Sequence, residues 1–409
     1  MLQIADDRER RMVAAADALL RVVLAVRPRR ARPSREAIRR ILVLRLERIG
    51  DLMMSLPALH LLRQLAPHAQ IDLVTGSWNA PLARLVEGIH RVETLDARWL
   101  SRGAGGLGFA ALVRRAWAWR RHRYDVAINL EGDIRSNLLL AVSGAAWTAG
   151  FDMAGGGPAL DDAVNFDPAD HTAQNGVRLV ASALGEATTP GGARTGTARE
   201  AASALPRAAL LLPADAREQA ERLLGPGLRS SSPAIGIQVG AGRLVKQWPA
   251  ERFAELADRL ASALNATIVL TGAPEDRPIA DVLRANLPPA TRVIDLVGTQ
   301  DLVTLAAVLE RLSVLVTPDT GPMHLAATVG TPVVALFGPA SPERWGPLSQ
   351  HCRIVRIDLP CSPCNRIRRP PSRCVGHTPD CMAGIEADHV YRAVTSLFES
   401  VPQPGARPS

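Results

Sequence analysis

Short apolar runs rich in β-branched residues alternate with helical stretches along most of this 409-residue chain, and this alternation constrains the fold more than any other feature. Each run has the length of a buried strand, and strands that alternate with helices form parallel sheets with helices on both faces. The strands are expected at 41–46, 71–74, 92–95 and 126–130, and again at 234–239, 267–270, 293–295, 313–317 and 332–337. Two such series in succession predict an α/β protein with two Rossmann-like, doubly wound domains facing across a cleft.

On this interpretation the chain has four parts: a basic N-terminal helix and linker, a first Rossmann-like domain, a second one that contains a cysteine-rich segment, and a C-terminal helix. Their predicted bounds are 1–40, 41–225, 233–385 (cysteine-rich segment 361–381) and 386–400. In open sheets of this type, ligands bind outside the carboxyl ends of the strands. The residues that carry chemistry are therefore expected in the loops that follow the strands.

One of these loops has the features of an anion site. The strand expected at 313–317 is followed by the tight polar turn Asp319-Thr320-Gly321, and Pro322 suits the first position of a helix because its missing N–H would be unpaired there anyway. A glycine turn at a helix N-terminus aims free backbone N–H groups and the positive end of the helix dipole at one point. An ordinary turn capped by Asp319 or Thr320 is the alternative.

Two further motifs, together with that turn, point to one protein family. They are Arg45-Leu-Glu-Arg-Ile-Gly-Asp51, which leads into Ser-Leu-Pro-Ala-Leu59, and Gly240-Ala-Gly-Arg-Leu-Val-Lys246-Gln-Trp-Pro249. In this order the three motifs resemble the bacterial heptosyltransferases of glycosyltransferase family 9, which move heptose from ADP-heptose to the lipopolysaccharide core. The resemblance runs from about Ile41 to the C-terminal region. It implies the GT-B arrangement, in which the C-terminal domain binds the donor and the N-terminal domain binds the acceptor.

The resemblance assigns the reaction chemistry to two residues. Asp51 stands where the family's Gly-Asp motif has its proposed general base, which takes a proton from the acceptor hydroxyl in an inverting transfer. Its alternative role is that of a helix N-cap. Lys246 would hold the diphosphate and stabilise the negative charge that builds as ADP leaves. It is the single lysine of the chain beside 47 arginines, which indicates that a compact ammonium is needed there.

The rest of the donor site is expected around Lys246. Gly240 and Gly242 let backbone N–H groups approach the phosphates, whereas the missing third glycine of a dinucleotide fingerprint disfavours NAD. The resemblance suggests that Glu275 contacts the nucleotide ribose, although its loop is one residue shorter than in the family, and a solvated carboxylate at a helix start is the alternative. The other donor-binding residues that the resemblance implies are Asp319 on the sugar and Thr320, Gly321 and His324 near the phosphates, with a core histidine as the alternative for His324.

The sequence contains no Asp-x-Asp pair, which metal-dependent sugar transferases commonly use to hold Mg²⁺ or Mn²⁺ on the diphosphate. We therefore expect transfer without a metal or other cofactor in catalysis. Cysteines at four positions form a separate signal, because clustered thiols in a cytosolic chain favour a structural zinc or iron site over disulfides. They are Cys361, Cys364, Cys374 and Cys381. Some protein-directed heptosyltransferases carry a similar iron-binding finger; four unligated thiols are the alternative.

The net charge of +8 is concentrated near the N-terminus, where residues 1–40 hold eleven arginines against five acidic residues. A helix with an apolar stripe, expected at 10–26, precedes an arginine-rich linker, and it either lies on an anionic inner-leaflet surface or packs on the protein itself. Aromatic residues make up only 4%, which disfavours nucleic-acid binding. No segment has the pattern of a transmembrane helix or a signal peptide, so we expect a cytoplasmic protein that is at most peripheral on the inner membrane.

Together these features predict an inverting glycosyltransferase that moves a heptose or related sugar from an ADP-sugar to a lipopolysaccharide core or other lipid-linked acceptor. Arg135 is the candidate contact for acceptor phosphates or sugar acids, with surface solvation as the alternative. Two other functions stay open: transfer to protein side chains, which the cysteine finger favours, and non-catalytic sugar-nucleotide binding on the same fold.

Overall fold

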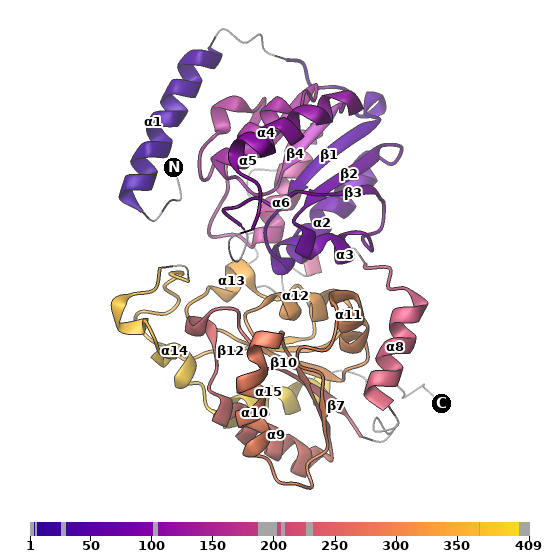
Figure 1. Ribbon diagram of the computed structural model, residues 1–409, viewed down its shortest axis with the longest axis vertical. Coiled ribbons are helices and arrows are strands. Elements are labelled where there is room, and N and C mark those ends of the chain that lie inside the picture. Colours follow the sequence, from indigo (N-terminus) through magenta and orange to yellow (C-terminus); the bar gives the residue numbers. More distant parts are fainter. Residues whose placement is uncertain are drawn as a thin grey trace. The chain divides into compact units, whose positions relative to one another are not determined.

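The computed structural model describes residues 4, 6–25, 30–100, 105–186, 203–205, 209–225, 232–367 and 369–400. The chain divides into two compact units, Met1–Arg194 with Leu205–Leu210, and Thr195–Ala204 with Leu211–Ser409. Each unit contains one parallel sheet of six strands with helices packed against it (Figure 1).

The sheet of the first unit has the strand order β3-β2-β1-β4-β5-β6. Its strands are β1 (Arg40–Arg45), β2 (Gln70–Thr75), β3 (Ile89–Thr94), β4 (Val126–Asn129), β5 (Trp147–Phe151) and β6 (Asp162–Val164). The main helices are α2 (Ile49–Leu65), α3 (Ala80–Ala83), α4 (Phe109–Ala118), α5 (Ile134–Val142) and α6 (Thr172–Ala183), with α2 packed on α6 and α4 on α5. All residues of β1 after Arg40 are buried, so this strand needs a continuous apolar run rather than alternation.

The sheet of the second unit has the equivalent order β12-β11-β10-β7-β8-β9. Its strands are β7 (Ala234–Gln238), β8 (Thr267–Thr271), β9 (Val293–Asp295), β10 (Val314–Pro318), β11 (Val333–Leu336) and β12 (Cys352–Val355). The helices of this unit are α8 (Ala214–Leu224), α9 (Ala250–Leu264), α10 (Arg277–Ala285), α11 (Leu302–Glu310), α12 (Gly321–Thr328), α13 (Pro342–Trp345), α14 (Asp380–Ala383) and α15 (Ala387–Ser400). Trp248 and Phe253 meet edge to face in its core, with ring centroids 4.7 Å apart.

The predicted α/β class with two doubly wound sheets is confirmed. Three strands were not predicted, namely β5, β6 and β12. Their sequences carry a weaker apolar signal: β5 has Thr, Ala and Gly at its centre, β6 is Asp-Ala-Val with a single β-branched residue, and β12 contains a cysteine and an arginine. β6 and β12 are edge strands, where half of the strand lacks a partner and the demand for apolar side chains is lower.

The division between the units falls near residue 211, earlier than the predicted domain limit at 225, because α8 packs on α11 of the second unit. Arg217 Nε lies 2.7 Å from Glu310 Oε2, and Thr304 Oγ1 donates to Gln219 Oε1 at 3.3 Å. The amphipathic pattern of α8 indicated a helix but carried no information on which unit would receive it.

The N-terminal helix α1 spans Asp7–Leu24, so it begins three residues before the predicted start at residue 10. Asp6 caps it, since its carboxylate accepts the Glu9 N–H at 2.9 Å. Among the residues that the structure describes, no helix combines the length and the apolar character required to cross a membrane.

Candidate active site

In both sheets the strand order reverses between the first and the fourth strand in sequence, which are β1 and β4 in one unit and β7 and β10 in the other. At such a switch point the loops after the two strands diverge to opposite faces and leave a crevice at the carboxyl edge, where ligands of doubly wound folds bind. Asp51 and Arg135 lie in the first turns of the helices that follow β1 and β4. The loops that carry Lys246 and Asp319 follow β7 and β10. Topology therefore brings the predicted residues to the ligand-binding edge of each unit.

Asp51 is the third residue of α2, and its carboxylate reaches back to the start of the helix. Its Oδ2 accepts the N–H of Arg48 at 3.0 Å, and its side chain is 26% exposed. The N-cap alternative for Asp51 is wrong, because α2 begins at Ile49 and Arg48 occupies the N-cap position. A third-position carboxylate that satisfies the N-cap N–H explains the earlier helix start. The partial exposure leaves Asp51 accessible to a substrate hydroxyl.

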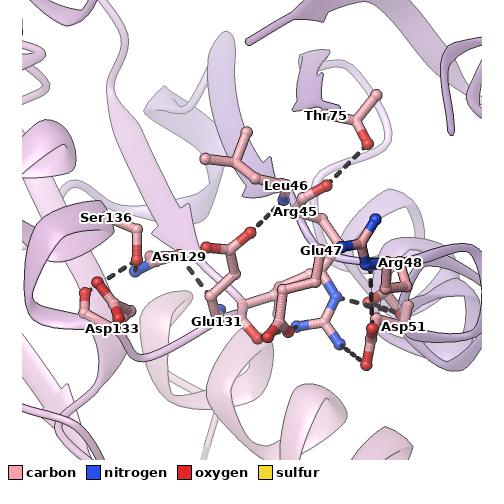
Figure 2. A network of polar contacts seen from close by, with 12 residues as sticks. Arg45, Leu46, Glu47, Arg48, Asp51, Thr75, Asn129, Glu131, Asp133 and Ser136 are labelled. Carbon is pink, nitrogen blue, oxygen red and sulfur yellow. Dashed lines mark hydrogen bonds and ion pairs between the residues drawn. The ribbon is translucent and has the colours of Figure 1, made fainter. Parts of the chain in front are cut away.

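Arg45, at the end of β1, is the buried hub of a charged network around Asp51 (Figure 2). Its Nη2 lies 3.5 Å from Asp51 Oδ1 and its Nη1 lies 3.2 Å from Glu47 Oε2. It also donates to the backbone oxygens of Leu130 at 2.5 Å and of Asp51 at 3.1 Å. A guanidinium with two carboxylates and two carbonyls around it is well compensated for burial, and it fixes the Asp51 loop against the end of β4.

Glu131, two residues after β4, is a buried carboxyl that the sequence did not single out. Its Oε1 accepts the Leu46 N–H, as Figure 2 shows, and its own N–H donates to Asn129 Oδ1 at 3.2 Å. Burial, followed by the charge of Glu47, raises the pKa of Glu131 to about 8, against the opposing effects of Arg45 and the Leu46 N–H. Glu131 is therefore largely protonated at neutral pH. It ties the loop after β1 to the loop after β4.

This shift of the Glu131 pKa predicts a pH-dependent stability. The pKa of Glu131 is higher in the folded chain (about 8) than its ordinary value of 4.5. The contribution of protonated Glu131 to the free energy of unfolding is therefore fully present below pH 4.5 and is lost as the pH rises to about 8. Glu131→Gln, which mimics the protonated acid, should be close to the wild type in stability at pH 5 and more stable at pH 9, by about 4 kcal/mol. Urea unfolding of the two proteins at both pH values measures this. Equal pH dependence in variant and wild type would contradict it.

Arg135, the predicted acceptor contact, is the second residue of α5. It makes a bidentate pair with Asp133, with Nε–Oδ1 at 2.8 Å and Nη2–Oδ2 at 2.6 Å, and its guanidinium stacks over the ring of Trp99 at 4.4 Å. Burial lowers the pKa of Arg135, but Asp133, Glu9 and Glu131 raise it overall. Its side chain is still 39% exposed, so one face of a fixed guanidinium remains open to an anionic group.

Lys246 and Asp319 are the predicted donor residues that the structure brings into direct contact. Lys246 ends a short 3₁₀ turn, Leu244–Lys246, after β7, and Asp319 directly follows β10. Their Nζ and Oδ2 atoms lie 2.6 Å apart, and both side chains are mostly buried. The neighbouring positions of β7 and β10 in the sheet explain this contact between residues 73 positions apart.

The turn after β10 leads directly into a helix, as predicted, but α12 begins at Gly321, so Pro322 is its second residue and not its first. Thr320 occupies the N-cap position of α12, its side chain makes no capping hydrogen bond, and Gly321 begins the helix. The Thr320 hydroxyl lies 3.2 Å from that of Thr317 instead. His324 lies one turn into α12 and is 5% exposed, so its burial agrees with the core alternative as well as with a place beside the turn. Neither Asp319 nor the Thr320 side chain caps α12.

Gly240 and the loop after β8 are in close contact through Asp276, a residue that the sequence did not single out. A Cβ on Gly240 would come within 1.8 Å of Asp276 Oδ2, so a larger residue there would displace this carboxylate. The same carboxylate oxygen accepts the Ala273 N–H at 2.8 Å. Gly242 has a φ of +62°, which also favours glycine. Glu275, the predicted ribose contact, is exposed in the turn Pro274–Asp276 that follows β8. Loops after β7, β8 and β10 therefore meet, as predicted for this half of the chain.

The four cysteines at 361–381 differ in exposure, from exposed Cys361 to buried Cys381. Burial, followed by the charges of Cys364, Cys374 and Cys361, raises the pKa of the Cys381 thiol to about 11, so the four groups are neighbours. Within the described residues, however, no three His, Cys, Asp or Glu side chains stand close enough to one another to hold a metal ion. The four thiols lie near one another, but they are not arranged to coordinate a metal ion.

Comparisons with known proteins agree with this architecture. A family model described as Glycosyltransferase family 9 (heptosyltransferase) matches residues 113–373. Lipooligosaccharide heptosyltransferase 2 of Haemophilus influenzae is 28% identical over 76% of this chain and 86% of its own length. Lipopolysaccharide heptosyltransferase 2 of Salmonella typhimurium is 29% identical over 78% and 88%. The solved structure of E. coli ADP-heptose LPS heptosyltransferase II matches with a TM-score of 0.69 at 23% identity, over 88% of this chain and 99% of that one.

Proposed function

This chain belongs to glycosyltransferase family 9, the heptosyltransferases, and on that premise we propose that it transfers a heptose from ADP-heptose to a lipopolysaccharide-core acceptor. The names of its relatives, which are lipopolysaccharide and lipooligosaccharide enzymes, support a saccharide acceptor over a protein side chain. The observation that carries the proposal is the pairing of Lys246 with Asp319 at the switch point of the second sheet, in the place where this fold binds nucleotides.

In the proposed reaction, Asp51 takes the proton from the attacking acceptor hydroxyl. The oxygen then bonds to the anomeric carbon of the heptose from the face opposite to the departing ADP, so that the configuration inverts. The bond between that carbon and the diphosphate breaks, and its electron pair leaves with ADP. Arg45 and the Arg48 N–H hold the Asp51 carboxylate in place, and its exposed part would receive the hydroxyl.

We propose that the second unit binds the donor through charge and backbone N–H groups. Lys246 would meet the diphosphate and stabilise the charge that grows on the leaving oxygen. Thr320 and Gly321, at the uncapped N-terminus of α12, would donate backbone N–H groups to the phosphates, with His324 beside them, and Asp319 would grip the sugar. Glu275 would reach the ribose from the loop after β8. We propose that no metal ion takes part in this chemistry.

The acceptor is proposed to be lipid-linked, with Arg135 as the contact for its acidic groups. The protein would work as a peripheral enzyme at the inner face of the inner membrane, with its arginine-rich N-terminal segment at anionic lipids.

A donor screen tests the proposed activity. Purified protein is incubated with a heptosylated-core precursor and, in parallel, with ADP-heptose or other nucleotide sugars, and products are followed by mass shift. We expect a heptose increment with ADP-heptose alone and an unchanged rate in EDTA. A different preferred sugar would overturn the donor assignment. Loss of turnover in EDTA that Mg²⁺ restores would overturn the metal-independent mechanism.

We also propose that Cys361, Cys364, Cys374 and Cys381 bind one structural zinc or iron ion. The Cys-x2-Cys spacing and the mutual effect of the thiols on Cys381 support this, although binding would require the thiols to move into ligand geometry. No catalytic step depends on this ion. Elemental analysis of the same preparation measures it, and a trace amount only would remove the proposal.

A further inference from the structure

One face of α1 is fixed to the first unit. Asp17, near its middle, is 6% exposed, and its Oδ1 accepts the Gly156 N–H at 2.7 Å. A Cβ on Gly155 would come within 2.3 Å of Val13 Cγ1, so the helix and this glycine pair are in tight contact. We call this contact between Asp17 and Gly156 the Asp17 seat. It fixes the position of α1, because any displacement of the helix would leave the buried carboxylate without its hydrogen-bond donor.

Another face of α1 is apolar and exposed. Met12, Leu19, Val22 and Val23 recur at helical spacing and are 59%, 64%, 74% and 59% exposed. Among the described residues, eleven large hydrophobic side chains are exposed, and four of them lie on this one helix. The arginines Arg8, Arg11 and Arg21 on α1 are exposed as well. An exposed apolar stripe with arginines beside it is the pattern of a helix that lies in a lipid interface.

The seat of α1 is part of the loop that positions the predicted acceptor residue. The Ile134 N–H donates to the Ala154 carbonyl at 3.2 Å, and the Ala154 N–H donates to the Gly132 carbonyl at 3.0 Å. Residues 154–156 are thus hydrogen-bonded both to α1, through Gly156, and to the loop before Arg135, through Ala154. The charge of Glu9 on α1 acts on Arg135. Figure 1 shows α1 at the margin of the first unit, outside the helices that cover the sheet.

We propose that α1 is a seated interfacial helix: its apolar stripe inserts into an anionic lipid surface, and its Asp17 seat holds the Arg135 loop at that surface. The charge of the region favours lipid over a second copy of the chain, because residues 1–40 carry eleven arginines and five acidic residues, and two such surfaces repel each other. Only the identity of what Arg135 meets there rests on the proposed function. Lipid binding itself does not.

Vesicle sedimentation tests the inserting face and needs no turnover. Leu19→Ser with Val23→Ser should weaken binding to phosphatidylcholine–phosphatidylglycerol vesicles by about tenfold or more, while Ala14→Ser with Ala18→Ser, also at exposed α1 positions, should bind as the wild type does. Wild-type binding should be much weaker to pure phosphatidylcholine. Wild-type binding that is absent, equal on both vesicles or unaffected by Leu19→Ser with Val23→Ser would overturn the proposal. So would a dimer in sedimentation velocity that this variant abolishes.

Asp17→Ala tests the seat, with acceptor in two forms. The variant keeps the apolar stripe, so vesicle binding should stay within about twofold of the wild type. Transfer to acceptor embedded in vesicles should fall by about fivefold or more, while transfer to the deacylated, soluble acceptor should be unchanged. Equal loss on both acceptors would show a structural defect and overturn the positioning role. A lack of transfer by the wild type would count against the proposed function and leave the vesicle result standing.

Discussion

Asp51→Asn should remove nearly all transfer activity, with kcat lower by about 10³-fold and ADP affinity within about twofold of the wild type. Asparagine keeps an oxygen that can accept the Arg48 N–H, so the start of α2 should persist. What it loses is the ability to take a proton from the acceptor. Steady-state kinetics on a soluble acceptor and calorimetry with ADP measure the two quantities. Arg45 would remain buried beside a neutral amide, with Glu47 as its remaining carboxylate partner.

Asp301→Asn is the matched control for this experiment. Asp301 makes the same kind of contact, since its Oδ1 accepts the Val303 and Thr304 N–H groups at 2.8 and 2.9 Å, but it caps α11 and has no part in the proposed site. Asparagine is an equally good cap, so activity should stay within about twofold. If Asp51→Asn keeps more than about a tenth of the turnover, Asp51 is not the base. No turnover in the wild type, with ADP bound, would favour a non-catalytic binding protein.

Most of the fold could be predicted because buried parallel strands have a sequence signature. The residues Ile41 to Leu44 and Val314 to Val316 are apolar in succession, and only a strand covered on both faces requires that. The same signal is missing from the edge strand β6. β6 is Asp-Ala-Val and half-exposed, and nothing in those three letters distinguishes it from a loop. The sequence also could not predict that α8 belongs to the second unit, because this depends on its contacts with α11 in the folded chain.

The sequence predicted those residues of the candidate site that a motif places near the end of a strand. It missed the residue whose role depends on burial in the folded chain. Lys246 and Asp319 were both named from motifs, yet their ion pair follows from the pairing of β7 with β10, which no local pattern contains. Glu131 reads as a loop carboxylate. It is buried because β4 lies beside β1 and brings it under the Leu46 N–H. A signal was present in hindsight: an acid two residues beyond a buried strand, at a switch point of the sheet.

Lys246→Ala should have the second large effect, lowering kcat by about 10²-fold or more and weakening ADP binding by about tenfold. The ammonium is the one lysine charge in the chain, and its removal leaves the proposed leaving group without its direct counter-charge. Arg243→Ala is the matched control, because it removes a positive charge from an exposed position of the same loop. Its effects should be much smaller. Equal effects of the two variants would mean that the loop acts through net charge and not through a placed ammonium.

Asp319→Asn should act on binding and turnover in opposite directions. Without ligand, Asp319 neutralises Lys246 at 2.6 Å, so a diphosphate must compete with a carboxylate that is mostly buried. Removing that competitor should tighten ADP binding by about three- to tenfold, while transfer falls because the proposed sugar contact is lost. The gain requires the ammonium, so the double variant with Lys246→Ala should bind ADP no better than Lys246→Ala alone. If Asp319→Asn instead weakens ADP binding as Lys246→Ala does, the Asp319 carboxylate holds the ammonium in place for the phosphates. The prediction that the diphosphate displaces Asp319 from Lys246 would then be wrong.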